Sequence, residues 1–554
     1  MFCESEGNNM GDDTREPSMN PAQSETPGMP GTSMRENRET PSVSGSSAPD
    51  QLEKATSYTT SVHAEGESDE QVVPAKGSNK EERSSAESVE GSCSTKGNTS
   101  EANTRRTLSR EGVPQGLAGV REAARRDRKQ KFTALLHHVT TDLLRDSYQS
   151  LKKQAAPGVD GVTWAQYGEG LEAQLQELHG RIHRGAYRAQ PSRRTYIPKA
   201  DGRPRPLGIA ALEDKIVQQA VVTVLNQIYE EDFLGFSYGF RPGRSQHDAL
   251  DALTVGLRRK KVSWVLDLDV RGFFDNVSHE WLVKFVEHRV ADRRIIRLIQ
   301  KWLKAGVSEE GEWTETKVGT PQGAVVSPLL ANIYLHYVFD LWVNQWRRKM
   351  AQAGDMIVVR YADDAVLGFE HRRQAEAFLE QLRERMRRFG LELHPEKTRL
   401  IEFGRFAEDN RKRRGEGKPE TFDFLGFTHI CGKTRKGGWF KVRRQTVKKR
   451  LRSKLQAVRQ ELRKRWHERI ADTGAWLRSV VQGYFNYHAV PGNFRALQTF
   501  RREVARAWQE ALRRRSQRHR LPWERFCSIL DRYLPLPRIL HPEPGARFDA
   551  KHPR

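Results

Sequence analysis

The chain has 554 residues, of which 36% are hydrophobic, and a formal net charge of +23 at pH 7. This length and composition can support several domains with buried cores. The sequence has no run of 18 or more apolar residues and no apolar N-terminal leader, which argues against a membrane protein and for a cytoplasmic one. Its cysteines form no C-x-x-C pair, so neither a structural zinc site nor a disulfide framework is expected.

The charge is unevenly distributed along the chain. Residues 1–104 contain 19 acidic and 8 basic side chains, a net charge of −11, so the remainder carries +34. Residues 1–112 are rich in Ser, Glu, Gly, Asn, Thr and Pro, which predicts a disordered acidic tail. Many basic side chains in the remainder are ordinary solvated surface, but so large an excess predicts a polyanionic partner.

Strand and helix patterns alternate from residue 113 to residue 430, which predicts an α+β fold there. An Arg-rich helix is expected over 117–126. At 264–270 the residues alternate as in a strand, which places Asp267 and Asp269 on the same face. An acidic strand face of this kind can supply a metal ligand.

A second acidic feature interrupts the apolar run at 357–369. The residues on both sides favour strands, whereas Asp is disfavoured inside a strand, so Asp363 and Asp364 are expected at a tight reversal of the chain. An Asp-Asp turn alone is often ordinary solvated surface. Together with Asp269, however, the pair predicts a three-carboxylate site for Mg²⁺, a hard cation that prefers oxygen ligands.

From about residue 447 the pattern becomes wholly helical. Apolar residues recur there at spacings of three and four, which predicts one helix face made by Val447, Leu451, Leu455, Val458, Leu462, Trp466 and Ile470. The rest of this helix is strongly basic. Further on, aromatic and Arg residues alternate between 476 and 508, and most of these aromatics are expected to be buried between helices.

Several ordered motifs resemble those of bacterial group II intron-encoded reverse transcriptases that are also maturases. They are the segments 196–209 (YIPKADGRPRPLGI), 238–245 (YGFRPGRS), 319–323 (GTPQG), 327–332 (SPLLAN), 361–364 (YADD), 390–398 (GLELHPEKT) and 424–427 (FLGF). Seven blocks in the family's order make a chance match negligible. The resemblance extends from about residue 115 to the C-terminus.

The resemblance implies a right-hand polymerase with an α-helical thumb and a maturase domain X. It divides the chain into a tail at 1–112, reverse transcriptase fingers and palm at 113–430, thumb and domain X at 431–545, and a C-terminal tail at 546–554. Relatives with an H-N-H endonuclease domain usually carry paired cysteines there, so such a domain is not expected here.

The resemblance also implies roles for individual residues. Two Mg²⁺ ions are expected on Asp269, Asp363 and Asp364, which are the expected catalytic residues, with Val270 as an additional metal-contacting position. Contacts to the incoming dNTP are expected from Lys199, Arg205, Phe274 and Gln322. Phe274 would favour dNTP over rNTP, while Phe273 is expected in the core, and Lys397 is a candidate general acid. Asp267 and Asp275 are expected to be structural.

The implied function is RNA-directed DNA synthesis combined with splicing of a group II intron and target-primed retrotransposition. The expected partners are the intron RNA, an RNA template with a DNA primer, target DNA in the bacterial nucleoid, and dNTPs; no membrane is expected. The sequence does not distinguish a monomer from a dimer. Two alternatives stay open. A maturase without polymerase activity would be expected to lose one of the three acids, and a retron-type or diversity-generating enzyme typically lacks domain X.

Overall fold

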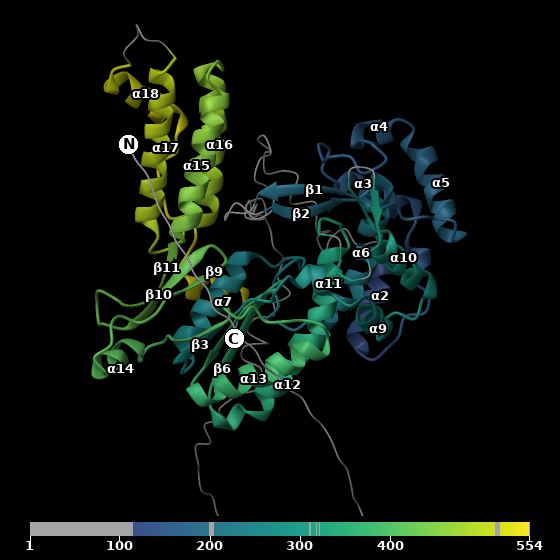
Figure 1. The fold of residues 1–554 in the computed structure, drawn as a ribbon, viewed down its shortest axis with the longest axis horizontal. Helices are drawn as coiled ribbons and strands as arrows, with labels where there is room; N and C mark the ends of the chain where they lie inside the picture. The colour runs from purple at the N-terminus through teal and green to yellow at the C-terminus, as the bar shows by residue number, and fades with distance from the viewer. Residues whose placement is uncertain are drawn as a thin grey trace, which may run out of the picture. The chain divides into compact units, whose positions relative to one another are not determined.

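The computed structural model describes residues 115–198, 204–309, 312–316, 318–320, 322–515 and 521–552. They all belong to the larger of two units into which the chain divides, residues 63–554. The acidic tail predicted at residues 1–112 lies outside the described residues. The described elements combine three sheets with many helices, which confirms the predicted α+β class (Figure 1).

The N-terminal part of the described chain is a helical layer with a small sheet. Helix α6 (Leu212–Asp232) is its centre, because α2 (Gln115–Arg126) and α3 (Thr141–Ser150) both pack against it. The small sheet has the order β2-β1-β4-β5 and consists of β1 (Ser192–Pro198), β2 (Pro204–Ile209), β4 (Val307–Glu309) and β5 (Glu312–Thr314). The other elements of this part are η3 (Leu136–His138), α4 (Trp164–Gly168), α5 (Leu171–His183), α8 (Phe273–Asn276), α9 (His279–Glu287) and α10 (Arg293–Lys304).

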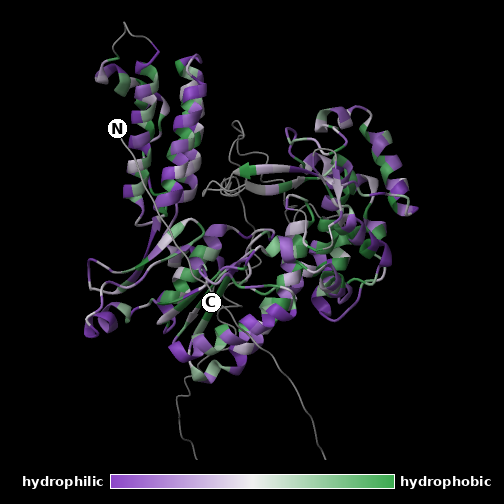
Figure 2. Cartoon of the chain, in the orientation of Figure 1, coloured by the Kyte–Doolittle hydropathy of each residue, from purple (hydrophilic) through white to green (hydrophobic). Residues whose placement is uncertain are grey.

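A second, four-stranded sheet carries the predicted acidic residues and is called the palm sheet below. Its order is β6-β7-β3-β8, all neighbours are antiparallel, and its strands are β3 (Trp264–Leu268), β6 (Met356–Tyr361), β7 (Asp364–Phe369) and β8 (Arg399–Glu402). Helix α7 (Gln246–Arg259) packs on β6, and α13 (Arg372–Arg388) packs on β3 and β7. Because helices cover it, β6 and β7 are buried over nearly their whole length, and their hydrophobic character is visible in Figure 2.

The remaining elements of this region connect and flank the palm sheet. They are α11 (Ser327–Leu335), the π-helical turn η4 (His336–Asp340), α12 (Leu341–Lys349), η5 (Ala351–Ala353) and α14 (Ala407–Arg413). A third sheet of order β11-β10-β9 follows, with β9 (Phe422–Phe424), β10 (Phe427–Lys433) and β11 (Phe440–Thr446). The domain boundary predicted after residue 430 therefore falls inside β10.

The helices after β11 have a hydrophobic core of their own. They are α15 (Lys448–Lys464), α16 (Ile470–His488), α17 (Phe494–Arg513) and α18 (Trp523–Tyr533). Helix α17 packs against both α15 and α16, as Figure 1 shows. Phe485, Phe500 and Trp508 are buried in this core, as expected for most of the aromatic residues of this segment. No helix in the described residues is long and apolar enough to cross a membrane.

The single apolar face predicted from Val447 to Ile470 is wrong at its C-terminal end. Helix α15 ends at Lys464, and the side chains of Trp466 and Ile470 are 37% and 40% exposed. At this interruption the Arg515 guanidinium donates hydrogen bonds to the carbonyls of Arg465 and Glu468, at 3.3 and 2.7 Å. These bonds satisfy carbonyls that would otherwise be left unpaired where the helix stops.

Residues 544–551 form helix α19 (Pro544–Lys551), where a C-terminal tail was expected from residue 546. This helix packs on α7 of the palm. Arg547 of α19 and Arg444 of β11 both form ion pairs with the buried carboxylate of Asp251 in α7. The C-terminal segment is therefore tied to the palm.

Asp292, which precedes α10, predicts an acid-sensitive contribution to stability. Burial would raise the pKa of its carboxyl, but hydrogen bonds from Arg294 and from the amides of Leu135 and Leu136 lower this pKa to about 2, from an ordinary 3.8. The folded state therefore favours the carboxylate, whose stabilisation is complete above about pH 4 and is lost as pH falls towards 2. We expect Asp292→Asn to lower the free energy of unfolding by about 2 kcal/mol at pH 7.

Urea denaturation of the wild type and of Asp292→Asn at pH 7 and at successive pH values down to 2 measures this contribution. The gap between the two proteins should narrow as the pH falls through the window between about 4 and 2. A gap that is the same at every pH would contradict the role given to the Asp292 carboxylate.

Candidate active site

The two adjacent acids lie at the β6–β7 connection, as predicted. Tyr361 pairs with Asp364 across the hairpin, so Ala362 and Asp363 form a two-residue turn. Ala362 has a φ of 55°, in the left-handed region that residues with a Cβ rarely adopt. The Asp363 side chain is half-buried and that of Asp364 is exposed. The turn therefore presents two carboxylates on a strained backbone.

Asp269 follows the end of β3, beside this turn. Strand β3 pairs with β7, and the ladder joins Asp267 to Val366 and Leu268 to Ala365. Continued by one residue, the register places Asp269 across from Asp364. Directly opposed residues on neighbouring strands point to the same face of a sheet. The sheet thus brings the three predicted acids to one edge. Val270, the remaining predicted metal position, is bridged to Leu393 and is buried.

Asp269 is paired with Lys397. The Lys397 ammonium lies 2.9 Å from Asp269 Oδ2, and the amide of His394 donates to the Asp269 carbonyl at 2.8 Å. Within the part of the chain that the structure describes, no three His, Cys, Asp or Glu side chains are gathered closely enough to hold a metal ion. Carboxylates at one edge repel one another unless a cation joins them, and here Lys397 supplies the positive charge beside Asp269. The residue types and the strand register nevertheless fit Mg²⁺, which binds carboxylate oxygens.

Asp267 lies on the same strand but in a different environment. Its burial raises the pKa of its carboxyl to about 7, with Asp269 and Asp423 adding to the rise and Arg399 opposing it. Arg399 is the nearest cation, at 3.9 Å. The Asp275 amide donates to the Gly272 carbonyl at 3.0 Å, in the turn that opens α8.

The residues predicted to contact the nucleotide are only partly brought together. Lys199 lies outside the described residues. The backbone of Arg205, in β2, pairs with that of Ile197 in β1. The Phe274 side chain is half-buried, whereas Phe273 is 2% exposed and belongs to the core, as expected. The backbone carbonyl of Gln322 accepts a hydrogen bond from the Gly208 amide at 2.7 Å, which joins the 319–323 turn to β2.

The same turn also contacts α8. The Thr320 amide donates to the Phe274 carbonyl at 2.7 Å, and Gly319 has a φ of 89°. A Cβ at Gly319 would lie 2.9 Å from the carbonyl oxygens of Phe274 and Asp275, so only glycine fits there without displacement. The Gly-Thr-Pro-Gln-Gly motif therefore supports the segment that carries Phe274.

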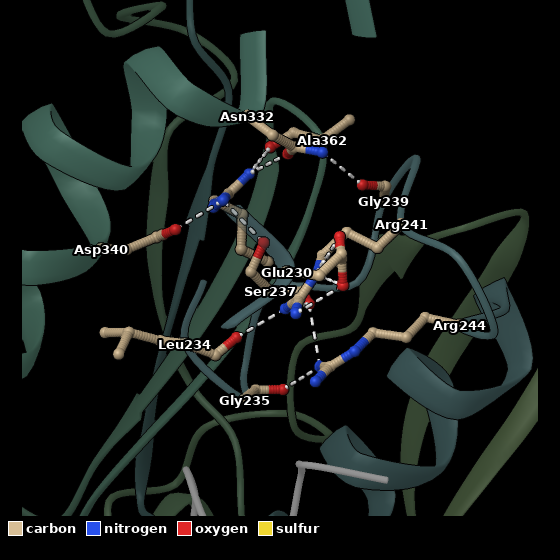
Figure 3. Close-up of polar contacts among 11 residues, drawn as sticks. Glu230, Leu234, Gly235, Ser237, Gly239, Arg241, Arg244, Asn332, Asp340 and Ala362 are labelled. Atoms are coloured by element: carbon tan, nitrogen blue, oxygen red, sulfur yellow. Dashed lines mark hydrogen bonds and ion pairs between the residues drawn. The ribbon is translucent and has the colours of Figure 1, made fainter. Parts of the chain in front are cut away.

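Sequence reasoning missed a buried polar cluster behind the acidic turn. Arg360, one residue before Tyr361, is 1% exposed and forms an ion pair with Asp340 at 2.6 Å. Its guanidinium also bonds Ser237, Asn332 and the carbonyl of Ala362; several of these partners are labelled in Figure 3. The sequence signal for this cluster was an Arg inside the apolar run 357–361. A strand buried on both faces cannot carry an unpaired charge without a large free-energy cost, so such an Arg indicates a buried partner.

The helix α15 presents most of its basic residues to solvent. The exposed ones are Lys448, Lys449, Arg450, Arg452, Lys454, Arg459, Arg463 and Lys464. Arg465 differs, because it is half-buried, paired with Glu461 and Glu468, and 4.8 Å from the centre of the Trp476 ring. Helix α15 thus carries a basic surface, whereas Arg465, just past its end, makes contacts within the protein.

This fold and the arrangement of the three acids fit the reverse transcriptase class. The family described as reverse transcriptase (RNA-dependent DNA polymerase) matches residues 197–429, which include the palm sheet and all three acids. Protein YkfC of Escherichia coli is 38% identical over 266 residues, which are 42% of this chain and 69% of that protein. The chain belongs to the reverse transcriptase family.

Two further relatives are proteins whose names refer to introns. The group II intron-encoded protein LtrA of Lactococcus lactis subsp. cremoris is 32% identical over 290 residues, which are 50% of this chain and 48% of LtrA. The mitochondrial nuclear intron maturase 1 of Arabidopsis thaliana is 28% identical over 92 residues, 17% of this chain and 13% of that protein. The chain thus spans about half the length of LtrA. These similarities confirm the family predicted from the ordered motifs.

Proposed function

We propose that the chain is an active RNA-directed DNA polymerase whose metal site consists of Asp269, Asp363 and Asp364. The observation that carries the proposal is the register of the palm sheet, which sets Asp269 across from Asp364 beside the β6–β7 turn. When bound there, two Mg²⁺ ions would activate a primer 3′-hydroxyl and neutralise the leaving pyrophosphate. Lys397 occupies Oδ2 of the Asp269 carboxylate, at 2.9 Å, beside the position proposed for the metal.

The other residues of the site bind and orient the substrates in this proposal. Lys199 and Arg205 hold the triphosphate, because fixed cations there offset charge on its β and γ phosphates. Gln322 contacts the nucleotide, and Phe274 lies beneath its sugar. Lys397 donates a proton to the departing pyrophosphate as a general acid in this proposal.

Primer extension tests the polymerase proposal. Purified protein should add dNTPs to a DNA primer annealed to an RNA template when Mg²⁺ is the divalent ion, and EDTA should stop the reaction. Radiolabelled or fluorescent products on a sequencing gel would identify templated addition. Untemplated addition would contradict RNA-directed synthesis. No addition with Mg²⁺ would contradict the proposed metal site.

Phe274 predicts a change in sugar selection. We expect Phe274→Val to reduce the preference for dNTP over rNTP by about 10-fold to 100-fold, because a smaller side chain leaves room for a 2′-hydroxyl. Single-nucleotide incorporation with matched dNTP and rNTP, compared as kcat/KM, measures the ratio.

Phe273→Val is the matched control for this substitution. It removes the neighbouring aromatic ring, that of Phe273, which is 2% exposed and lies in the core. It should lower stability and leave the dNTP to rNTP ratio unchanged. Equal losses of discrimination in both variants would remove the specific role proposed for Phe274.

The proposal includes binding and splicing of a group II intron RNA, and copying of that intron at a DNA target. It is supported by the basic surface of α15, since A-form RNA presents phosphates and a shallow minor groove to such a surface. Filter binding of the intron RNA from the flanking DNA, at several salt concentrations, tests it. The logarithm of the affinity should fall linearly with the logarithm of salt, and the protein should accelerate splicing of that RNA at low Mg²⁺.

A further inference from the structure

Arg360 is fully buried near the end of β6, two residues before the turn residue Ala362. Its side chain is 1% exposed, and its partner Asp340 is 0% exposed. An Arg guanidinium has five N–H donors, and a buried donor without a partner is costly. The five hydrogen bonds of this guanidinium go to Asp340 Oδ1 (2.7 Å) and Oδ2 (2.6 Å), Ser237 Oγ (2.7 Å), Asn332 Oδ1 (3.1 Å) and the Ala362 carbonyl oxygen (2.8 Å).

The bond to Ala362 is the one that concerns the active site. Ala362 has a φ of 55°, and such strained conformations persist where the surroundings hold them. The Arg360 Nη1 donor holds the Ala362 carbonyl, which belongs to the peptide linking Ala362 to Asp363. A shift of this peptide would move the Asp363 carboxylate with it. The guanidinium therefore fixes the backbone from which a proposed metal ligand projects.

Other segments hold the same turn from behind. The Asn332 side-chain amide donates to the Gly239 carbonyl at 2.8 Å while its oxygen accepts from Arg360. Segment 236–238 is bonded to β6, with the Tyr238 amide donating to the Arg360 carbonyl at 2.8 Å. A Cβ added at Gly239 would overlap the Ala362 amide nitrogen. Figure 3 shows Asn332 and Gly239 beside Ala362.

Asp340, the charge partner of Arg360, comes from an unusual element. It ends the π-helical turn η4, which lies between α11 and α12. π-Helical turns are rare in proteins, and those that occur often lie at functional sites. Segments 237–239 and 332–340 thus converge, through buried polar contacts, on the segment 360–362 that leads into the turn.

We infer that Arg360 is a positioning residue for metal-dependent catalysis, acting with Asn332 and Gly239 to set the Ala362–Asp363 peptide. The inference rests on the proposed function of Asp363 as a metal ligand. A structural role alone would make Arg360 matter only for folding. A positioning role predicts, in addition, an altered response to Mg²⁺ in protein that is folded.

Two variants that disturb the turn in different ways test this inference. Arg360→Lys keeps the buried positive charge but lacks the fork of donors that reaches both Asp340 and Ala362. Gly239→Ala keeps every charge and pushes on the Ala362 amide. Single-turnover primer extension across a Mg²⁺ titration, primer-template binding and thermal unfolding are measured for each. We expect the maximal rate to fall on the order of 100-fold, as for small misplacements of reacting groups. The half-saturating Mg²⁺ concentration should rise severalfold, with primer-template affinity unchanged.

Arg289→Lys is the matched control. Arg289 is as buried as Arg360 and is paired with Asp232 at 2.9 Å, but it bonds the carbonyls of Ala124 and Asp127 instead of the turn. This variant should lose stability and keep the wild-type Mg²⁺ dependence.

Each outcome decides between the possible roles. If Arg360→Lys and Gly239→Ala both keep the wild-type Mg²⁺ curve and rate per folded molecule, the positioning role is wrong. Asp363→Asn, measured in parallel, separates this failure from failure of the proposed function. Normal extension by Asp363→Asn would overturn the metal site and the inference together, whereas an inactive Asp363→Asn beside unaltered turn variants would overturn the inference alone.

Discussion

Asp363→Asn should abolish primer extension while leaving the protein folded and able to bind nucleic acid. The substitution keeps the shape of the side chain and removes the negative charge that a divalent cation requires. Metal ions stabilise transition-state charge by several kcal/mol, and about 4 kcal/mol corresponds to a 1,000-fold loss in rate. Single-turnover incorporation with Mg²⁺, together with primer-template affinity, measures this effect.

Asp355→Asn is a suitable control, because Asp355 directly precedes the opposite end of the same strand, β6. Its carboxylate accepts a hydrogen bond from the Lys261 amide at 2.9 Å. This variant should extend primers at nearly the wild-type rate. An equal loss in both variants would indicate general damage to the palm sheet and not removal of a metal ligand.

The largest expected effect on stability is at Asp251. Its carboxylate is 2% exposed and pairs with Arg444, also 2% exposed, at 2.9 Å, and with Arg547 of α19. Burial lowers the pKa of Arg444 and Asp251 opposes that shift, so the aspartate compensates the buried guanidinium charge. Asp251→Ala would leave buried positive charge uncompensated. We expect the free energy of unfolding to fall by about 3 to 5 kcal/mol, measured by urea denaturation.

Asp549→Ala provides the comparison on the same interface between α7 and α19. Asp549 pairs with Arg259 at 2.8 Å, but the two side chains are 49% and 34% exposed. Surface pairs of this kind contribute under about 1 kcal/mol. Similar losses in the two variants would contradict the argument that burial determines the cost.

The metal-site residues differ in how far sequence reasoning could reach them. The turn at Asp363 and Asp364 was predictable from local pattern, because strand preference on both sides leaves two acids only at a reversal. The position of Asp269 beside Asp364 depends on pairing between strands about 100 residues apart, which alternation does not specify. The grouping of Asp269 with the turn was instead predicted from the resemblance of the motifs to those of the family.

The polar cluster behind the turn shows a different limit. Arg360 lies in an apolar run, but its partners Ser237, Asn332 and Asp340 come from distant segments, and no spacing rule links them. The prediction for Ile470 failed for a related reason. A period of three and four continues through 465–469, yet the helix ends at Lys464, and Arg515 from a distant segment bonds the carbonyls of Arg465 and Glu468.

The most direct test of this account compares wild type and Asp363→Asn in two assays on the same preparations. One assay is Mg²⁺-dependent extension of a DNA primer on an RNA template, and the other is splicing of the intron RNA encoded beside the gene. The account predicts that wild type does both and that Asp363→Asn splices without extending. If neither protein extends the primer and both support splicing, the palm is a scaffold for a maturase, and the proposed polymerase site is wrong.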